Sequence, residues 1–277
     1  MAKIIHTSTG ASNSPRELIV TPKIIGVPTG GLYLWTDEND YIEHTTFSGR
    51  IARVLNQVAD PSPNISGLYC DQWDPNYKGR GYPTVDTTQF EGINCLKFIS
   101  PPGTGRNYLR VNPGLNILDP YTGTTTSGLI KISSGSQPLP HTIIKVDVRY
   151  SAIFYSPANV NGKWRCQDAT YNFFDVGDTD DFPDPVDEWH LFTTVVQTSP
   201  TGIARLYIDG EKVFDVSLSY SPYLATRLEN IYMLNRKSNP LDGIFNGYVA
   251  HTAAWLRPLS DSEVLRYWGV IKNKYGL

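Results

Sequence analysis

The stretch WHLFTTVVQTSPTGIARLYIDGEKVFDV, residues 189–216, decides the fold class. Near its end, two runs rich in β-branched and aromatic residues flank Asp209 and Gly210, and Asp-Gly between such runs predicts a hairpin turn. Glycine adopts the positive φ of such a turn without a Cβ clash, and aspartate tolerates it better than most residues. The register stays open, because a two-residue loop pairs Leu206 with Val213 whereas a four-residue loop pairs Ile208 with Val213.

The first part of the same stretch, residues 189–196, predicts a strand that precedes the hairpin. Its aromatic and β-branched residues suit a pleated sheet. A helix is disfavoured because Thr193, Thr194, Val195 and Val196 would place four β-branched side chains in a row. Together with the hairpin, this strand forms a meander and indicates an all-β domain.

The composition agrees with many short strands joined by turns. The chain has 277 residues, which fits one large all-β domain or two small ones, and its 20 Pro and 23 Gly provide the turns. The formal net charge of -3 and the lack of any run of Lys or Arg disfavour nucleic acid and anionic membrane surfaces as partners.

Cysteine use and the N-terminal residues predict a protein made in a reducing cytoplasm. Cys70, Cys95 and Cys166 are few and lack Cys-x-x-Cys spacing, so we expect buried free thiols rather than a disulfide framework or a zinc site. Residues 1–7 lack the apolar core of a secretion signal, and no apolar run is long enough to cross a membrane.

We expect residues 1–30 to form an extended N-terminal arm and residues 31–277 to form the folded domain. In the arm, the short apolar runs 18–20 and 24–25 are broken by proline and surrounded by Ser and Thr, so they cannot build a core alone. Such an arm docks on a partner by adding a strand to a sheet edge. The alternative is a frayed terminus with one edge strand.

The remaining strands are predicted from short apolar or alternating runs between Gly and Pro residues. They are 31–35, 92–99, 108–111, 144–154, 171–176, 230–234 and 247–255. In the run 144–154, apolar and polar residues alternate most regularly. It is interpreted as one strand with a buried apolar face and a solvent-exposed polar face. Residues 51–58 fit either a helix or a strand. Segment 59–81 is predicted to be a loop, and segment 121–140 a polar surface excursion.

One short C-terminal helix is predicted from its caps. Ser260 and Glu263 have the spacing of a capping box, and Gly276 suits the helix end. The apolar positions on one face are Val264, Trp268 and Ile271.

Three motifs follow one another in the C-terminal half: LYIDG at 206–210, FNGYV at 245–249 and WLRPLSDSEV at 255–264. In this order they resemble the laminin-G-like jelly roll, a branch of the concanavalin A-like lectin/glucanase superfamily. The likeness extends over roughly residues 30–275. It implies a two-sheet antiparallel jelly-roll sandwich with the arm at one end of the chain and the helix at the other.

No catalytic residues are predicted. A glucanase needs two carboxylates that flank the sugar bond, and the family's Glu-x-Asp-x-x-Glu run is absent. The acidic clusters 37–40 and 187–188 lie at strand ends or turns, and no Gly-x-Ser-x-Gly elbow occurs. His190 and His251 lie within predicted strands and are interpreted as structural histidines. We therefore expect a protein that is not an enzyme.

No metal or cofactor is predicted either. One loop gathers acidic residues of the kind that bind calcium, and members of the superfamily often hold calcium in such loops. These residues are Asp175, Asp178, Asp180, Asp181 and Asp184. Their spacing matches no fixed calcium template, so the loop is not assigned as a metal site.

Aromatic residues in the predicted loops suit two purposes. They stack on sugar faces, or they cap the sandwich and line protein interfaces. The candidates are Tyr69, Trp73, Tyr77 and Trp164.

The resemblance implies a structural protein of a virion, similar to the accessory proteins that decorate the heads or tails of tailed phages. On this hypothesis the chain docks on capsid or tail subunits through its arm and sandwich, forms a homo-oligomer, and reaches the virion from the host cytoplasm. The alternative is a carbohydrate-binding or receptor-binding module of lectin type.

Overall fold

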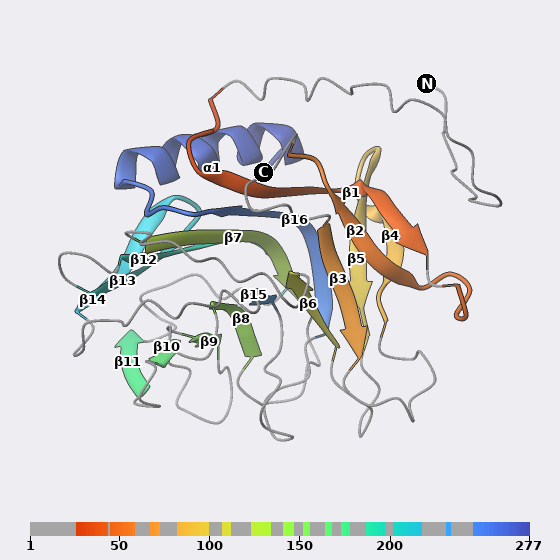
Figure 1. Cartoon of the computed structure of the whole chain (residues 1–277), viewed down its shortest axis with the longest axis horizontal. Coiled ribbons are helices and arrows are strands. Elements are labelled where there is room, and N and C mark those ends of the chain that lie inside the picture. Colours follow the sequence, from red (N-terminus) through yellow and green to blue (C-terminus); the bar gives the residue numbers. More distant parts are fainter. Residues whose placement is uncertain are drawn as a thin grey trace.

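The computed structural model consists of β-strands and one C-terminal helix (Figure 1). It describes residues 26–43, 45–58, 67–72, 82–99, 107–111, 123–133, 141–146, 152–155, 164–167, 173–177, 187–197, 202–217, 231–233 and 246–277. The elements are β1 (Leu32–Glu43), β2 (Ile51–Asn56), β3 (Gly67–Gln72), β4 (Thr84–Phe90), β5 (Ile93–Phe98), β6 (Asn107–Val111), β7 (Gly123–Ile132), β8 (His141–Val146), β9 (Ala152–Tyr155), β10 (Trp164–Gln167), β11 (Phe173–Gly177), β12 (Trp189–Gln197), β13 (Ile203–Ile208), β14 (Glu211–Ser217), β15 (Ile231–Met233), β16 (Gly247–Trp255) and α1 (Asp261–Tyr275).

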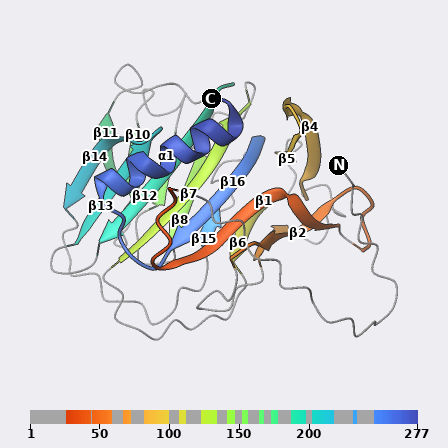
Figure 2. The ribbon, with the colours of Figure 1, turned by 90° about the horizontal axis from the view of Figure 1, so that it is seen from above.

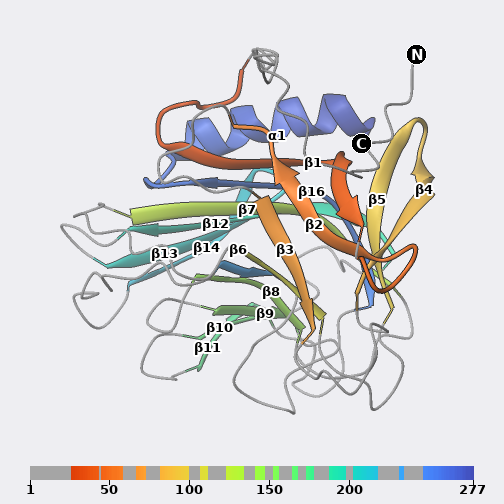
Figure 3. The same ribbon diagram turned by 45° about the vertical axis from the view of Figure 1, so that its right-hand side comes forward.

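The strands form two layers that share one hydrogen-bonded path. The path runs β11-β10-β9-β8-β15-β6-β3-β2-β1-β16-β7-β12-β13-β14, with β5 on β16 and β4 on β5, and the described pairs are antiparallel. β1 passes from one layer to the other, since residues 32–37 pair with β16 and residues 36–43 pair with β2. Helix α1 covers the outer face of the β16 layer (Figure 3). The predicted all-β antiparallel fold with one C-terminal helix is confirmed.

The predicted hairpin forms, and a β-bulge resolves its register. Asp209 and Gly210 have φ of 52° and 81°, so both turn residues are left-handed, as in a type I′ turn. The strands close directly on this two-residue turn, but a register shift follows and places Leu206 opposite Phe214. Val213 is therefore the extra residue of a bulge, and neither simple register applies. The bulge lets Phe214, which is buried, face the core.

The prediction for residues 121–140 is wrong over 123–132. This segment is β7, a central strand between β16 and β12. Two of its buried polar side chains, Thr125 and Ser127, are satisfied by backbone groups of distant segments. The Thr125 hydroxyl donates to the carbonyl of Arg257 and accepts from the backbone N–H of Leu259, both at 2.9 Å. The Ser127 hydroxyl donates to the carbonyl of Phe192 at 3.0 Å.

Three other expectations change. The single strand predicted over 144–154 is two strands, β8 and β9, which pair antiparallel with each other. The alternation of apolar and polar residues indicates which face of the sheet each side chain points to. It does not indicate whether the chain reverses direction within the run. The predicted loop 59–81 contains β3, and the ambiguous segment 51–58 is strand β2.

Helix α1 packs on the sheet through four buried side chains: Val264, Tyr267, Ile271 and Tyr275. Its capping box at Ser260 and Glu263 and its left-handed Gly276 are present as predicted. Trp268, predicted on the buried face, is half-buried beside it. The sequence pattern identified Val264 and Ile271 but not the two tyrosines.

His251 fills the interface between α1 and the sheet. Its Nδ1–H donates to the carbonyl of Thr36 at 2.9 Å, and its Nε2 accepts from the Tyr267 hydroxyl at 2.9 Å. The ring also lies 4.3 Å from the ring of Trp35 between centroids. Both ring nitrogens are satisfied in the neutral form, which confirms the structural interpretation of this histidine.

Residues 26–30, the end of the predicted arm, contact the domain. Val27 is buried in the cluster beneath α1, and the indole N–H of Trp255 donates to the carbonyl of Pro28 at 2.7 Å. Residues 1–25 lie outside the described residues, so docking of the arm on a partner stays a prediction. Within the described chain, no helix has both the length and the apolar composition of a transmembrane span.

We predict that Gly210→Val destabilises the protein by about 2–3 kcal/mol. The valine would have to adopt a φ of 81°, and a Cβ at this position would lie 3.0 Å from side-chain atoms of Trp268. Urea denaturation measures the loss. The control is Gly269→Ala in α1, where a new Cβ meets no atom within 4 Å and the helix gains up to about 1 kcal/mol. An unchanged midpoint for Gly210→Val would contradict the turn geometry.

Candidate functional site

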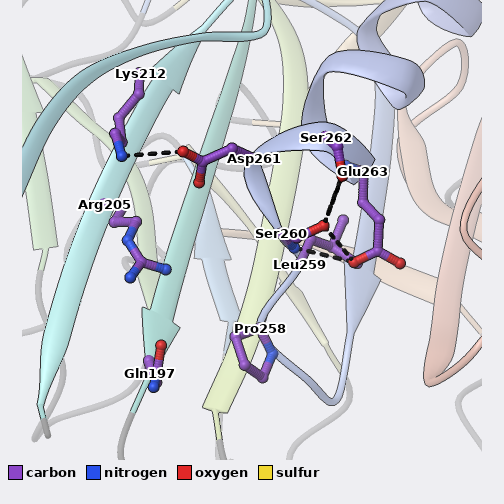
Figure 4. Close-up of a pocket in the computed structure, with 9 residues that line it drawn as sticks. All are labelled: Gln197, Arg205, Lys212, Pro258, Leu259, Ser260, Asp261, Ser262 and Glu263. Atoms are coloured by element: carbon purple, nitrogen blue, oxygen red, sulfur yellow. Dashed lines mark hydrogen bonds and ion pairs between the residues drawn. The ribbon is translucent and has the colours of Figure 1, made fainter.

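An open hollow of about 680 Å³ lies between the β13–β14 hairpin and the start of α1. Figure 4 shows the nine residues that line it, from β12, β13, β14, the segment before α1 and the first turn of α1. They are Gln197, Arg205, Lys212, Pro258, Leu259, Ser260, Asp261, Ser262 and Glu263.

The charges that line this hollow are paired with each other or with neighbours. Asp261 accepts from the Tyr207 hydroxyl at 2.7 Å and from Lys212 Nζ at 3.0 Å. Those two hydrogen bonds lower the pKa of Asp261, while burial and then the bond to Asp261 raise the pKa of Tyr207. Arg205 Nε donates to Asp215 at 3.1 Å. The two bonds to Asp261 join the hairpin to the helix and favour the ionised form of Asp261, whereas the Arg205–Asp215 bond lies within the hairpin. The hollow is therefore a structural junction.

The capping box adds a second ion pair at the same junction. The Arg257 guanidinium donates two hydrogen bonds to the Glu263 carboxylate, at 2.6 and 2.9 Å. Glu263 also accepts from the backbone N–H of Ser260 at 3.0 Å. The bonds from Arg257 are the main reason that the pKa of Glu263 falls to about 2. Glu263 is therefore an anchor for the helix start.

His190 supports the hairpin turn. The Asp209 carboxylate accepts from His190 Nδ1 at 2.7 Å and from the backbone N–H of Leu191 at 2.8 Å. The buried Nε2 makes no hydrogen bond to a described residue and lies 3.7 Å from a Glu188 carboxylate oxygen. This histidine holds the left-handed Asp209 against β12, which agrees with its structural interpretation.

Most of the sequence-predicted site residues fall outside what the structure describes. Trp73, Tyr77, Asp178, Asp180, Asp181 and Asp184 lie outside the described residues, as do the side chains of Tyr69, Trp164, Asp175 and residues 37–40. Cys70 and Cys95 are buried thiols, and the Cys166 side chain is not described. The described residues hold no group of His, Cys, Asp and Glu arranged to bind a metal ion.

A row of alternating aromatic and basic side chains crosses four strands of the sheet. Cross-strand register places Trp189 of β12 opposite Lys131 of β7, Lys131 opposite Tyr248 of β16, and Tyr248 opposite Lys97 of β5. Side chains of directly opposite residues point to the same face of a sheet. We call these four residues the aromatic–lysine row.

The row lies on the outer face of the sheet, which α1 covers in part. Lys97 lies between two inner-core residues, and so does Lys131, so both lysines point to the opposite face. Trp189 and Tyr248 pack with the outer cluster beneath α1. Seen from above, β16 runs between α1 and the β4–β5 hairpin (Figure 2).

Contacts within the row order its side chains while all four remain partly exposed. The ammonium groups of Lys97 and Lys131 lie 5.5 and 5.8 Å from the ring centroid of Tyr248, within cation–π distance. The Trp189 ring lies 4.8 Å from Phe90 and 6.2 Å from Tyr248 between centroids. A half-exposed surface of this kind has apolar ring faces and polar hydrogen-bonding groups side by side.

Sequence reasoning missed this row. One local signal was available, because each lysine interrupts an apolar run, as in Leu96-Lys97-Phe98 and Ile130-Lys131-Ile132. A lysine in such a run indicates the solvent-exposed face of a strand. The row itself comes from the register of strands that are far apart in the sequence, and β7 was not recognised as a strand.

The sandwich, its C-terminal helix and an outer face with aromatic and basic side chains define a lectin-like β-sandwich module. The chain belongs to the concanavalin A-like lectin/glucanases superfamily, whose model matches residues 104–265. No curated protein sequence is a significant match to the chain.

Solved structures with a similar fold include a domain of an arabinanase and the binding domains of toxins. Domain 4 of AbnA, an extracellular arabinanase from Geobacillus stearothermophilus solved in complex with arabinotriose, has a TM-score of 0.54 at 15% identity, covering 84% of this chain and 96% of the domain. The binding domain of botulinum neurotoxin DC, in complex with rat synaptotagmin II, has a TM-score of 0.55 at 13% identity over 86% of this chain. The binding domain of Paraclostridial Mosquitocidal Protein 1 has a TM-score of 0.54 at 15% identity over 88% of this chain.

The chain spans about half the length of each of the two toxin domains, with 51% and 53% covered. At these identities the likeness shows the fold alone. The superfamily's name includes glucanases, whereas the matched segments are domains of an arabinanase and binding domains of toxins.

We predict that Glu263→Gln lowers the free energy of unfolding by about 1 kcal/mol near neutral pH, as for a partly exposed ion pair. The pKa of Glu263 is depressed from 4.5 to about 2 in the folded protein. Its contribution to stability is therefore complete above about pH 4.5 and is lost as the pH falls toward 2. Glutamine keeps the capping-box geometry but carries no charge.

Urea denaturation of both proteins across this pH range measures the difference, which should shrink toward zero at the acid end. Glu91→Gln, at an exposed residue between β4 and β5, is the control. A difference between wild type and Glu263→Gln that stays constant with pH would contradict the role of the Arg257 ion pair.

Proposed function

We propose that this chain is a binding module without catalytic activity, and that it recognises carbohydrate through the aromatic–lysine row. The single observation that carries this proposal is the row itself. The partly exposed ring of Trp189 suits the C–H face of a sugar, and Tyr248 orders the two lysines beside it. The lysines and Gln89 supply hydrogen bonds to hydroxyl groups. Aromatic anchors beside a few oriented polar groups are typical of small-ligand sites.

The chemistry around the row favours binding over hydrolysis. Glycoside hydrolysis needs a carboxylic acid that keeps its proton and a second carboxylate across the sugar bond. Asp86 is the carboxylate that contacts the row, at 3.6 Å from Lys97. Burial works to raise its pKa, but hydrogen bonds from Thr88 and the charge of Lys97 outweigh burial and lower the pKa. Asp86 is therefore a poor proton donor.

The fold supports the same proposal by analogy. A domain of similar fold was solved with arabinotriose, and others are the binding domains of toxins. This analogy favours the carbohydrate-binding or receptor-binding alternative over a virion structural role. Docking on virion subunits and location in the virion stay predictions, because no finding tests them.

We predict that the purified protein binds oligosaccharides on a glycan array and that Trp189→Ala weakens this binding about tenfold, the effect of losing one aromatic contact. Isothermal titration calorimetry with the best array ligand measures the change. Trp268→Ala is the matched control, because Trp268 is a half-buried tryptophan that packs against Gly210 and does not belong to the row. The proposal fails if no glycan binds or if both tryptophan variants bind as well as wild type.

A further inference from the structure

Within the described part of the chain, the two lysines of the row have one carboxylate as an ion-pair partner. Among the described contacts of Lys131, the hydrogen-bond partner is the neutral amide of Gln89 at 3.2 Å, and the other is the Tyr248 ring. Lys97 has one carboxylate nearby, that of Asp86. Among the residues that the structure describes, two ammonium groups thus face the ring of one tyrosine, and Asp86 is the carboxylate that pairs with one of them.

The other acidic residues described near the row either make separate contacts or are exposed. Asp187, whose backbone N–H donates to the carbonyl of Ile132 at 2.7 Å, is exposed. Glu188 precedes Trp189 in the chain, but its carboxylate lies 3.7 Å from His190, whose cross-strand partner Ile130 belongs to the inner core. Asp86 is already hydrogen-bonded by the Thr88 hydroxyl at 2.6 Å and the Thr88 backbone N–H at 2.8 Å. Glu91 is exposed between β4 and β5.

This charge distribution distinguishes between classes of ligand. A ligand that covers the row displaces water from both ammonium groups, and the lost hydration is costly unless new partners replace it. The hydroxyl groups of a neutral sugar replace this hydration only in part. An anionic group forms charge-assisted hydrogen bonds to the ammonium groups, and these are about twice as strong as hydrogen bonds between neutral groups. Complementary charge also speeds encounter and excludes wrong partners.

We propose that the aromatic–lysine row binds an acidic saccharide, one that carries carboxylate or sulfate groups. Lys131 and Lys97 hold the anionic groups on either side of Tyr248, while Trp189, packed on Phe90, supplies the stacking surface at the end of the row. This inference rests on the proposed function and adds the chemical class of its ligand.

The test compares ligands that differ in charge alone. Trigalacturonate and its methyl ester have the same sugar chain, and only the first is anionic. Calorimetry with the full-length protein should give binding of trigalacturonate at least tenfold tighter than binding of the ester. A heparin-derived hexasaccharide provides a second, sulfated probe. Raising NaCl from about 50 mM to about 500 mM should weaken binding of both acidic probes several-fold, because salt screens exposed charges.

Variants assign the effect to the row. Lys131→Gln should weaken binding of the acidic probes about fivefold or more, and it should weaken binding of the neutral ester less, because the ester loses a hydrogen bond but no ion pair. The matched control is Lys272→Gln on α1, whose ammonium group lies over Trp268, at 6.0 Å from its ring centroid, rather than over Tyr248. This control removes the same charge from another part of the surface and should leave all affinities unchanged.

The outcomes separate this inference from the proposed function. Equal affinity for trigalacturonate and its ester, with both lost in Trp189→Ala, overturns the acidic class and leaves carbohydrate binding in place. Equal weakening by Lys131→Gln and Lys272→Gln overturns the row as the site of the charge effect. Failure of both acidic probes and of every array glycan overturns the inference together with the proposed function.

Discussion

The hydrogen bonds of three tyrosine hydroxyls between α1 and the sheet determine where the helix lies. Three tyrosine hydroxyls cross this interface: Tyr267 to His251, Tyr275 to the carbonyl of Ala250, and Tyr207 to Asp261. A buried hydroxyl without a partner costs about 1–3 kcal/mol, so a helix displaced along its axis would lose several such contacts together. The apolar contacts of α1 favour burial but tolerate small shifts, whereas these hydrogen bonds specify one position. The outer face that remains uncovered, where the row lies, follows from that position.

Local signals in the sequence were sufficient for the elements whose geometry is local. Asp209 and Gly210 turn the hairpin because only a few residue types accept two positive φ values in succession. Ser260 and Glu263 start α1 because they satisfy backbone groups within one turn. β7 was not predictable in this way, since its Thr and Ser side chains look solvated until the carbonyls of Phe192 and Arg257 come near them. The bulge at Val213 was not predictable either, because it depends on the tertiary packing of Phe214.

The candidate site was harder to predict than the fold. Reasoning from sequence favoured the aromatics of loops, where recognition residues often gather, and those side chains lie outside what the structure describes. The row instead uses strand residues from four segments between positions 97 and 248, and no motif spans such a distance. Taken singly, none of the four residues is unusual. Each is a lysine on the solvent-exposed face of a strand or an aromatic residue near the start of a strand. Their chemistry becomes visible only when the register brings them together, which is why the fold of a superfamily constrains function so weakly.

The contact of Phe90 with both Trp189 and Tyr275 has a consequence for the last turn of α1. Phe90 lies 4.8 Å from the first ring and 5.1 Å from the second. Helix ends fray readily, and fraying here removes one of the two rings that hold Phe90 in place. A ligand that requires an ordered Trp189 therefore binds preferentially to molecules whose helix end is closed, and by linkage it suppresses the opening of that end. Amide hydrogen exchange in residues 272–276 then serves as a reporter of occupancy.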